Sequence, residues 1–569
     1  NGTFRGNRAM TRYEAAALLN ACLDRVTEVT DQLKSLISEF EKELAMIAGK
    51  VDGLEARVGE LAATQFSTTT KLKGYSAWVF GAAEGFDGDA LKTHTQNVVV
   101  QTYENLVVYG KKTVDGRTVN DPGTVEAHLA ESWKISEDGK TWVFKLREGI
   151  KSPYGNELTA DDVEWSWSKS FAQKRTGNFI ARVSNVVGVK AISKYEVEFT
   201  LSAPSSIFLK ALTLYVPGIY DSTEVKKHAT SEDPWALKWM QSNTAGFGAY
   251  HLESLRPDDQ AVYVANKNYF GGDLHFDRVI YKEVPSEASR VTLLKTGQVH
   301  LIDRPSIQKV VDLQKDTNVK VDRASGRSIA SARMNPKCEP FDDVRVRQAF
   351  NYAIDKDALN TAVFAGQADI AKSVVPPIVD GYNPDHFNYD YDPAKAKALL
   401  ADAGFPNGIS EPIQLLYADA FWHQEPVAIQ VADMLKKVGV NIQPTRVTTS
   451  EMRAKGSPKE MSMCFFTWED GPIVLDPVYT MYLISHSKGV SNRSAYSNSR
   501  VDELIDMSRE ELDAGKRLKM MDEAQKLWVT DAPWILTAYP ATFEAMNPRL
   551  NGWVHYPDEH ERWRELEMK

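Results

Sequence analysis

The chain has 569 residues, a hydrophobic fraction of 43% and a formal net charge of −10 at pH 7. At roughly 100–200 residues per domain, this length predicts about two to four domains, each large enough to bury a core. The sequence has no uninterrupted apolar stretch of the roughly eighteen residues that a membrane helix needs. The negative charge disfavours the nucleic-acid backbone as a partner and is compatible with cationic or zwitterionic ligands.

Three cysteines, Cys22, Cys338 and Cys464, lie far apart along the chain. Their spacing matches neither a metal site nor the framework of a small disulfide-rich domain, so the sequence does not reveal the redox compartment. The first residues, "NGTFRGNRAM", contain neither the basic nor the apolar region of a signal peptide. They indicate a mature product or a fragment, and export cannot be inferred from this end.

The first 65 residues predict helical structure. Thr11 and Glu14 form the capping-box pattern at the start of one helix. A heptad pattern then predicts a coiled coil over residues 31–65. Its apolar positions are Leu33, Ile37, Phe40, Leu44, Ile47, Val51, Leu54, Val58 and Leu61. A coiled coil implies self-association, and the alternative is one amphipathic helix packed on a globular core.

Two stretches of this region, "TFRGNRAMTRYEAAALL" and "KLKGYSAWVFGA", have a recognisable pattern. With the heptads between them, they resemble the periplasmic arm of cyanobacterial outer-membrane porins. The resemblance implies a remnant of an S-layer-homology module in residues 1–30, with peptidoglycan as its partner. It also implies a linker with a porin-like strand in residues 66–90. The match ends near "GFDGDALK", which indicates a fusion of two unrelated proteins.

From Leu91 onward, the pattern alternates strands and helices. "SWKISEDGKTWVFKLREG" predicts a β-hairpin that turns at Asp138-Gly139. "LTADDVEWSWSK" predicts a helix with Thr159 and Asp162 as its capping box. "KYEVEFTLSAP" predicts a strand with alternating apolar residues.

Two further helices have clear start signals. In "YDPAKAKALLADAGFPNG", Asp392 is the predicted N-cap, and Gly404 follows the helix. In "PFDDVRVRQAFNYAIDKDAL", Asp343 is the predicted N-cap, and Val346, Phe350 and Ala353 are predicted to face inward. The fold class is therefore mixed α/β.

The segments "VEAHLAESWKISEDGKTWVFKLREGIKSPYGNELTADDVEWSW", "NTAGFGAY", "FDDVRVRQAFNYAIDKDAL" and "SAYSNSRVDELI" occur in a fixed order. Residues 91–569 thereby resemble the family 5 solute-binding proteins of peptide and nickel ABC importers. The resemblance implies a periplasmic or extracellular receptor with two lobes, an extra subdomain and a membrane permease as its partner. Lobe I is expected at residues 91–300 and 525–569, and lobe II at 301–524. Because porin-like sequence replaces the family's opening strand, lobe I is expected to lack an edge strand.

The stretch "MCFFTWEDGPIVLDP" runs an apolar strand into two adjacent acids before a Gly-Pro turn signal. In peptide-binding relatives, a carboxylate shortly after a Trp pairs with the α-ammonium of the ligand. Asp470 best matches that position, with Glu469 beside it and Thr467 before Trp468. An ammonium leaving water needs a fixed anion, and Trp468 offers it a flat apolar face. The alternative is that both acids are solvated turn residues. The segment is about two residues longer than in dipeptide receptors, so either acid fits the salt-bridging position.

Other candidates follow from the same resemblance. Arg333 and Asn335 match positions that line the cleft, and an Arg suits a ligand carboxylate. An ordinary salt bridge is the alternative for Arg333. Tyr417, Trp422 and His423 form a predicted side-chain pocket or a packing cluster. Gly246 and Gly248 suit close backbone approach near the hinge or a structural turn.

The sequence contains no P-loop, nucleophile elbow or paired-histidine zinc helix. Adjacent acids on a strand point to opposite faces, which is poor geometry for acid–base catalysis on one bond. We therefore expect no enzyme and no cofactor. The predicted function is capture of a short peptide for an ABC importer by hinge closure. The alternatives are a receptor for nickel chelates, opines or sugars, a wall-attached structural protein, and an enzyme.

Overall fold

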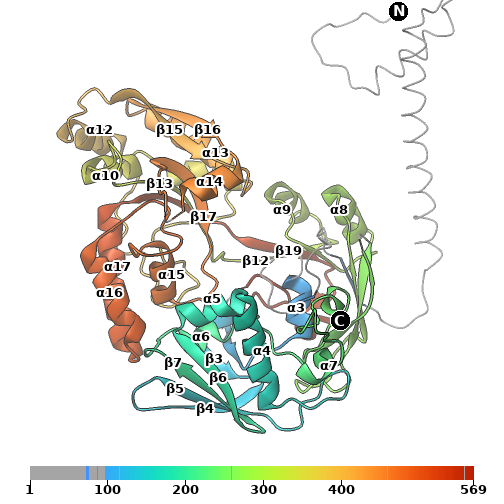
Figure 1. Cartoon of the computed structure of the whole chain (residues 1–569). Coiled ribbons are helices and arrows are strands. Elements are labelled where there is room, and N and C mark those ends of the chain that lie inside the picture. The colour runs from blue at the N-terminus through green and yellow to red at the C-terminus, as the bar shows by residue number, and fades with distance from the viewer. Residues whose placement is uncertain are drawn as a thin grey trace, which may run out of the picture. The chain divides into compact units, whose positions relative to one another are not determined.

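The computed structural model describes residues 72–75, 86–87, 96–114, 116–257, 259–457, 459–556 and 558–569. These residues form two lobes, each built on one large sheet (Figure 1). The expected mixed α/β fold with two lobes is therefore confirmed. The predicted S-layer-homology remnant and coiled coil lie outside the described residues and stay predictions. Among the described helices, none combines the length and the apolarity that crossing a membrane requires.

The first lobe contains a seven-stranded sheet in the order β12-β19-β11-β1-β10-β9-β8. Its strands are β1 (Leu72–Tyr75), β8 (Tyr250–Arg256), β9 (Gln260–Ala265), β10 (Arg278–Lys282), β11 (Leu301–Asp303), β12 (Lys320–Ala324) and β19 (Thr542–Met546). Strand β1 pairs in parallel with both β10 and β11. The expectation of a missing strand was wrong, because the segment that resembles a porin strand pairs in the interior of this sheet.

Smaller sheets complete this lobe. A four-stranded sheet has the order β4-β5-β7-β6, and β2-β3 and β20-β21 form separate pairs. The strands are β2 (Val107–Val114), β3 (Arg117–Ala127), β4 (Ala130–Ile135), β5 (Thr141–Leu146), β6 (Val186–Ser193), β7 (Glu196–Leu201), β20 (Leu550–Asn551) and β21 (Glu567–Met568). The antiparallel pairing of β4 with β5 confirms the predicted hairpin. Helix α4 (Ala160–Gln173) begins at Thr159 with the predicted capping box.

The second lobe contains a six-stranded sheet in the order β14-β18-β13-β17-β15-β16. Its strands are β13 (Ile329–Met334), β14 (Asp369–Ile370), β15 (Ile409–Tyr417), β16 (Val440–Arg446), β17 (Phe465–Asp470) and β18 (Trp534–Tyr539). Two predicted helices of this lobe are confirmed. Asp343 caps α10 (Val344–Tyr352), and Asp392 caps α12 (Pro393–Asp402). Buried Val346 and Phe350 of α10 face the core, as the pattern predicted.

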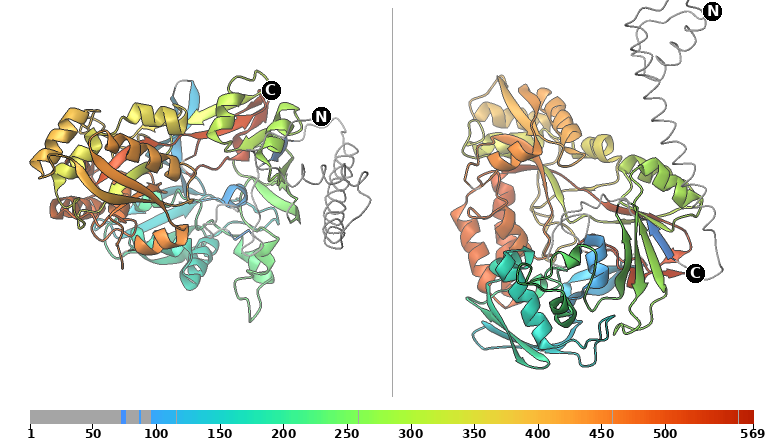
Figure 2. Two further views of the ribbon diagram at one scale, coloured as in Figure 1. Left: turned by 90° about the horizontal axis from the view of Figure 1, so that it is seen from above. Right: turned by 45° about the vertical axis from the view of Figure 1, so that its right-hand side comes forward.

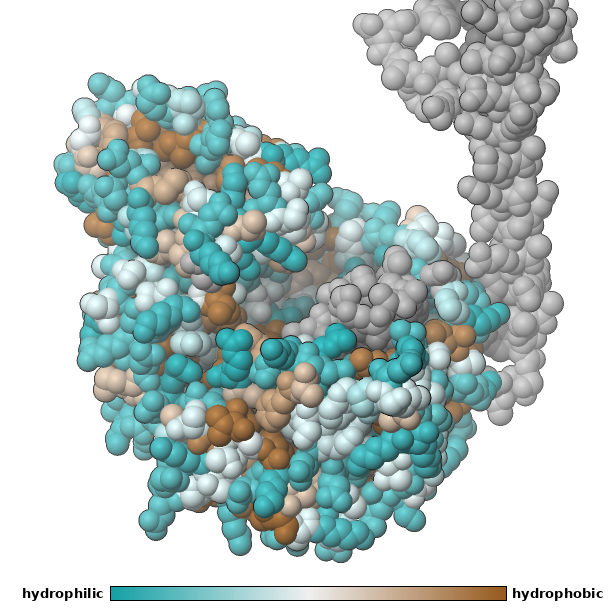
Figure 3. Space-filling model, in the orientation of Figure 1, coloured by the Kyte–Doolittle hydropathy of each residue, from teal (hydrophilic) through white to brown (hydrophobic). Residues whose placement is uncertain are grey.

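Most of the remaining helices cover these sheets (Figure 2). In the first lobe they are α3 (Gln96–Thr102), α5 (Thr176–Val183), α6 (Phe208–Ala211), α7 (Ser222–Lys227), α8 (Glu287–Lys295), α9 (Ile307–Leu313) and the 3-10 turns η1 (Trp239–Gln241) and η2 (Trp563–Glu565). In the second lobe they are α11 (Lys356–Phe364), α13 (Gln424–Lys436), α14 (Thr449–Lys455), α15 (Pro477–Ile484), α16 (Ser499–Glu510) and α17 (Ala514–Asp531). The space-filling view shows a largely hydrophilic face that is hollowed between the two lobes (Figure 3).

The chain crosses between the two large sheets twice, at residues 325–328 and at residues 540–541. The crossings lie against each other, because a Cβ on Gly326 would be 1.7 Å from the Pro540 carbonyl oxygen. The expected lobe boundaries stay predictions. The crossings lie at other positions along the chain, since β11 and β12 belong to the first sheet and β18 belongs to the second. Within the first crossing, Arg327 Nη1 donates to the Gly471 and Pro472 carbonyls, each at 3.1 Å.

Candidate functional site

Strand β17 brings the predicted acids to the edge of the second lobe's core. Its neighbours in the sheet are β13 and β15. Phe465, Phe466, Thr467 and Trp468 are buried, whereas the two acids that follow are partly exposed. A strand between two others and covered on both faces has a continuous apolar run, which explains the sequence pattern. Glu469 and Asp470 lie at the end of the strand, where its faces are no longer fully covered.

Asp470 forms an ion pair with Arg333, which lies on the adjacent strand β13. Nη1 of Arg333 is 2.7 Å from Oδ2 of Asp470, and their side chains are 0% and 12% exposed. The Arg333 guanidinium also stacks on Trp534, with Cζ 3.8 Å from the ring centroid. Nε of Arg333 donates to Oγ of Ser331 at 3.1 Å. The structure thus joins two predicted ligand residues to each other.

Trp468 and Arg493 complete this cluster. The indole Nε1 of Trp468 donates to Oδ1 of Asp470 at 3.3 Å. The Arg493 guanidinium carbon lies 4.8 Å from the centroid of the Trp468 ring. Burial lowers the pKa of Arg493, although nearby Asp470 opposes that shift. No local pattern points to Arg493, which lies in the loop between α15 and α16, and only the folded chain brings it to Trp468.

Glu469 points to the opposite face of β17 and pairs with His423. Its Oε2 is 2.5 Å from Nε2 of His423, and the side chains are 14% and 3% exposed. His423 directly precedes α13, and its ring lies 5.6 Å from that of Trp422. Trp422 itself is 58% exposed. The two adjacent acids therefore have separate partners on separate faces, as the alternation of a strand requires.

The other predicted residues of this lobe have contacts of their own outside this cluster. Thr467 is buried, and its carbonyl accepts a hydrogen bond from Gln424. Nδ2 of Asn335 donates to the Met461 and Met463 carbonyls, which fixes a loop. Tyr417 donates to Glu425 at 3.0 Å on the exposed surface. Roles of these side chains in ligand binding stay predictions.

Gly246 and Gly248 pack against the end of α3 in the first lobe. A Cβ on Gly246 would lie 2.3 Å from the Thr102 carbonyl oxygen, and one on Gly248 would lie 2.4 Å from the Gln101 carbonyl oxygen. Gly248 N also donates to the Thr102 carbonyl at 3.0 Å. Close backbone approach, which the sequence suggested, explains both glycines.

Cys338 and Cys464 form a disulfide across 126 residues of sequence. Strands β13 and β17 pair so that Met334 lies opposite Phe465, which brings the two cysteines together just beyond the strand ends. The spacing of the cysteines does not reveal this disulfide, because the pairing depends on strand register and not on local spacing. A disulfide is typical of proteins outside the cytoplasm.

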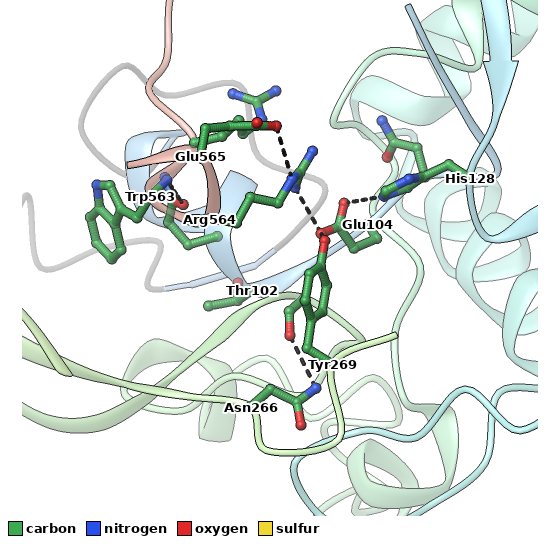
Figure 4. Close-up of polar contacts among 12 residues, drawn as sticks. Thr102, Glu104, His128, Asn266, Tyr269, Trp563, Arg564 and Glu565 are labelled. Atoms are coloured by element: carbon green, nitrogen blue, oxygen red, sulfur yellow. Dashed lines mark hydrogen bonds and ion pairs between the residues drawn. The ribbon is translucent and has the colours of Figure 1, made fainter. Parts of the chain in front are cut away.

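A second charged cluster lies in the first lobe around Glu104 (Figure 4). The carboxylate accepts hydrogen bonds from Arg564 at 2.8 Å and from Tyr269 at 3.0 Å, and it lies 2.8 Å from Nε2 of His128. Burial alone would raise the pKa of Glu104, but Arg564 and His128 outweigh it and lower the pKa to about 2. Glu565 continues the network through Tyr556 and Lys111. No local pattern in the sequence points to this cluster.

One further carboxylate group has the composition of a metal site. Oxygen atoms of Asp303, Glu544 and Glu561 lie within 4.8 Å of one another, and all three residues are buried. Burial and nearby Asp303 raise the pKa of Glu561 to about 8. Nε of Arg304 lies 3.4 Å from Asp303. Because the protein itself supplies this positive charge, we assign no metal to the group.

Comparisons with known proteins agree with this architecture. The family model described as "Bacterial extracellular solute-binding proteins, family 5 Middle" matches residues 124–492. Heme-binding protein A of Haemophilus influenzae is 29% identical over 484 residues, which cover 80% of this chain and 85% of that protein. The dipeptide-binding protein of Escherichia coli K12 is 29% identical over 513 residues, which cover 84% and 91%.

A solved structure shares the fold. The structure of HbpA2 from Haemophilus parasuis has a TM-score of 0.78 at 23% identity, and the match covers 88% of this chain and 100% of that one. The family model spans more than half of this chain. The chain therefore belongs to the bacterial extracellular solute-binding proteins of family 5.

Proposed function

We propose that this protein captures a short peptide between its two lobes and delivers it to the membrane permease of an ABC importer. As a family member it acts in the periplasm or extracellularly, as the sequence predicted. The similarity to a dipeptide-binding protein over 84% of the chain supports a peptide ligand. The two adjacent crossings between the sheets suit a hinge, at which ligand contacts to both lobes would stabilise a closed state.

The observation that carries the proposal is the charged end of β17. Arg333 holds the Asp470 carboxylate from the interior of the lobe, while the Asp470 side chain stays 12% exposed. A peptide ammonium would therefore meet an anion whose position is fixed in advance, which reduces the ordering cost of binding. The buried Trp468 ring lies beside this carboxylate and donates a hydrogen bond to it.

We also propose binding without turnover. Glu469 and Asp470 pair with His423 and Arg333 on opposite faces of β17. Two acids arranged in this way do not converge on one bond of a ligand, so acid–base catalysis lacks its geometry.

Isothermal titration calorimetry of the full chain with di- to pentapeptides tests the proposal. We expect binding that weakens by about 10- to 100-fold when the peptide is N-acetylated, the effect of losing a hydrogen bond to a charged group. Asp470→Asn should reduce the affinity for free peptides by a similar factor, with Glu469→Gln as the matched control.

Equal binding to the native protein and Asp470→Asn would move the ammonium site elsewhere. If a folded protein binds no peptide, the ligand class is wrong. Heme is then the next ligand to titrate, because a relative with 29% identity is a heme-binding protein.

A further inference from the structure

The charges around Trp468 do not balance on its face of β17. Arg333 forms an ion pair with Asp470, whose side chain is 12% exposed. Glu469 lies on the other face with His423. Arg493 remains, and its Nε has no hydrogen-bond partner within the described part of the chain. Among the described residues of this face, the guanidinium of Arg493 thus carries a positive charge that neither strand acid pairs with.

The loop that carries Arg493 is fixed on both sides of this residue. Nδ2 of Asn492 donates to the His486 carbonyl at 3.1 Å and to the Tyr496 carbonyl at 2.7 Å. On the other side, Oγ of Ser494 accepts a hydrogen bond from Trp534 at 3.0 Å. Both residues are buried, whereas Arg493 is only partly buried. The fold therefore holds Arg493 in position over Trp468.

An incompletely paired guanidinium that is partly removed from water lowers stability unless a partner completes its hydrogen bonds. Its planar fork matches a carboxylate in a bidentate pair, and that pair can lie flat against an indole ring. The Arg493 guanidinium lies over the Trp468 ring, with Cζ 4.8 Å from the ring centroid, which is the position that such a pair requires. Burial lowers the pKa of Arg493, which is the direction expected for a cation without a full set of partners.

We propose that Arg493 binds a carboxylate of the ligand along the face of Trp468. This inference rests on the proposed function and specifies its ligand class: short peptides with an acidic group near the end of β17. The carboxylate comes either from the peptide C-terminus or from an Asp or Glu side chain. Asp470 and Arg493 together would bind an ammonium and a carboxylate that lie close together on one peptide.

The test compares four peptides by calorimetry on the full native chain. Ala-Ala-Ala and its C-terminal amide differ only in the terminal carboxylate. The amides of Ala-Glu-Ala and Ala-Gln-Ala differ only in the side-chain carboxylate. In one of the two pairs, we expect the peptide that carries the carboxylate to bind about 10- to 100-fold more tightly than its neutral partner. That pair identifies the source of the carboxylate.

Arg493→Gln should abolish this preference, giving equal affinities within the pair, and Arg493→Lys should restore part of it. Arg509→Gln is the matched control, because Arg509 stacks on Tyr482 at 4.1 Å without contacting Trp468. Thermal unfolding checks that each variant is folded, and the four-peptide comparison on the native protein does not depend on any variant.

Peptides that bind with equal affinity in both pairs, or a preference that survives in folded Arg493→Gln, would overturn the role of Arg493 and leave peptide capture intact. A native protein that binds none of the four peptides nor the di- to pentapeptide series would overturn the proposed function and this inference together.

Discussion

Glu104 in the first lobe and Asp470 in the second are both carboxylates paired with an arginine in the protein interior, and they differ in how fully they are paired. Glu104 has Arg564, Tyr269 and His128 around it. Asp470 has Arg333 and a longer contact to Trp468, with a second guanidinium beside them. A fully paired network stabilises the fold, whereas an incomplete one leaves hydrogen bonds that a ligand can supply.

The largest effect is expected from breaking the pair in the second lobe. Arg333→Ala should lower the free energy of unfolding by about 3–5 kcal/mol, because it leaves Asp470 without its counter-charge and opens space against Trp534. Urea unfolding measures the loss. The double variant Arg333→Met with Asp470→Leu should recover most of it, since removing both charges removes the unpaired group. A double variant as unstable as Arg333→Ala would show that packing, not charge, dominates there.

The next effect depends on pH and belongs to Glu104. Its pKa of about 2, against an ordinary 4.5, corresponds to about 3 kcal/mol of stability. Because the pKa is lowered in the folded state, this stability is present above pH 4.5 and is lost as the pH falls towards about 2. Glu104→Gln should therefore be less stable than the native protein at pH 6, and the difference should shrink in acid. Urea unfolding across this range checks it, and a difference that stays constant with pH contradicts the assignment.

The smallest effect is expected at the exposed end of the same network. Lys111 pairs with Glu565 at 2.7 Å, but the side chains are 40% and 22% exposed. Lys111→Ala should cost less than about 1 kcal/mol, and high salt should remove the difference, because exposed pairs are screened. A larger loss of stability in urea unfolding would mean that the exposed pair of Lys111 and Glu565 is coupled to the buried network around Glu104.

Local signals predicted local structure well. Asp343, Asp392 and Thr159 start helices in the structure because an N-cap side chain and its backbone partners lie within a few residues. The alternation of β17 likewise predicted that Glu469 and Asp470 would face apart. Such features depend on neighbours in the sequence, so one sequence suffices to find them.

Features that depend on strand register could not be predicted. Arg333 meets Asp470, and Cys338 meets Cys464, only because β13 pairs with β17 in one particular register. Glu104 and Arg564 are 460 residues apart and meet through the packing of the first lobe. Arg493 meets Trp468 through the packing of the loop between α15 and α16, and the residues next to it in the sequence give no sign of this contact.

The position of β19 has a consequence for how the protein is made. This strand, from residues 542–546, lies between β11 and β12 and joins them into one sheet. A ribosome completes the second lobe's last strand, β18, before β19 is synthesised. Until then, β11 and β12 each expose an unpaired edge, a surface prone to association with other chains. The lobe that begins first along the chain is therefore the last to be completed, and loss of a short C-terminal segment would damage it more than the lobe made in between.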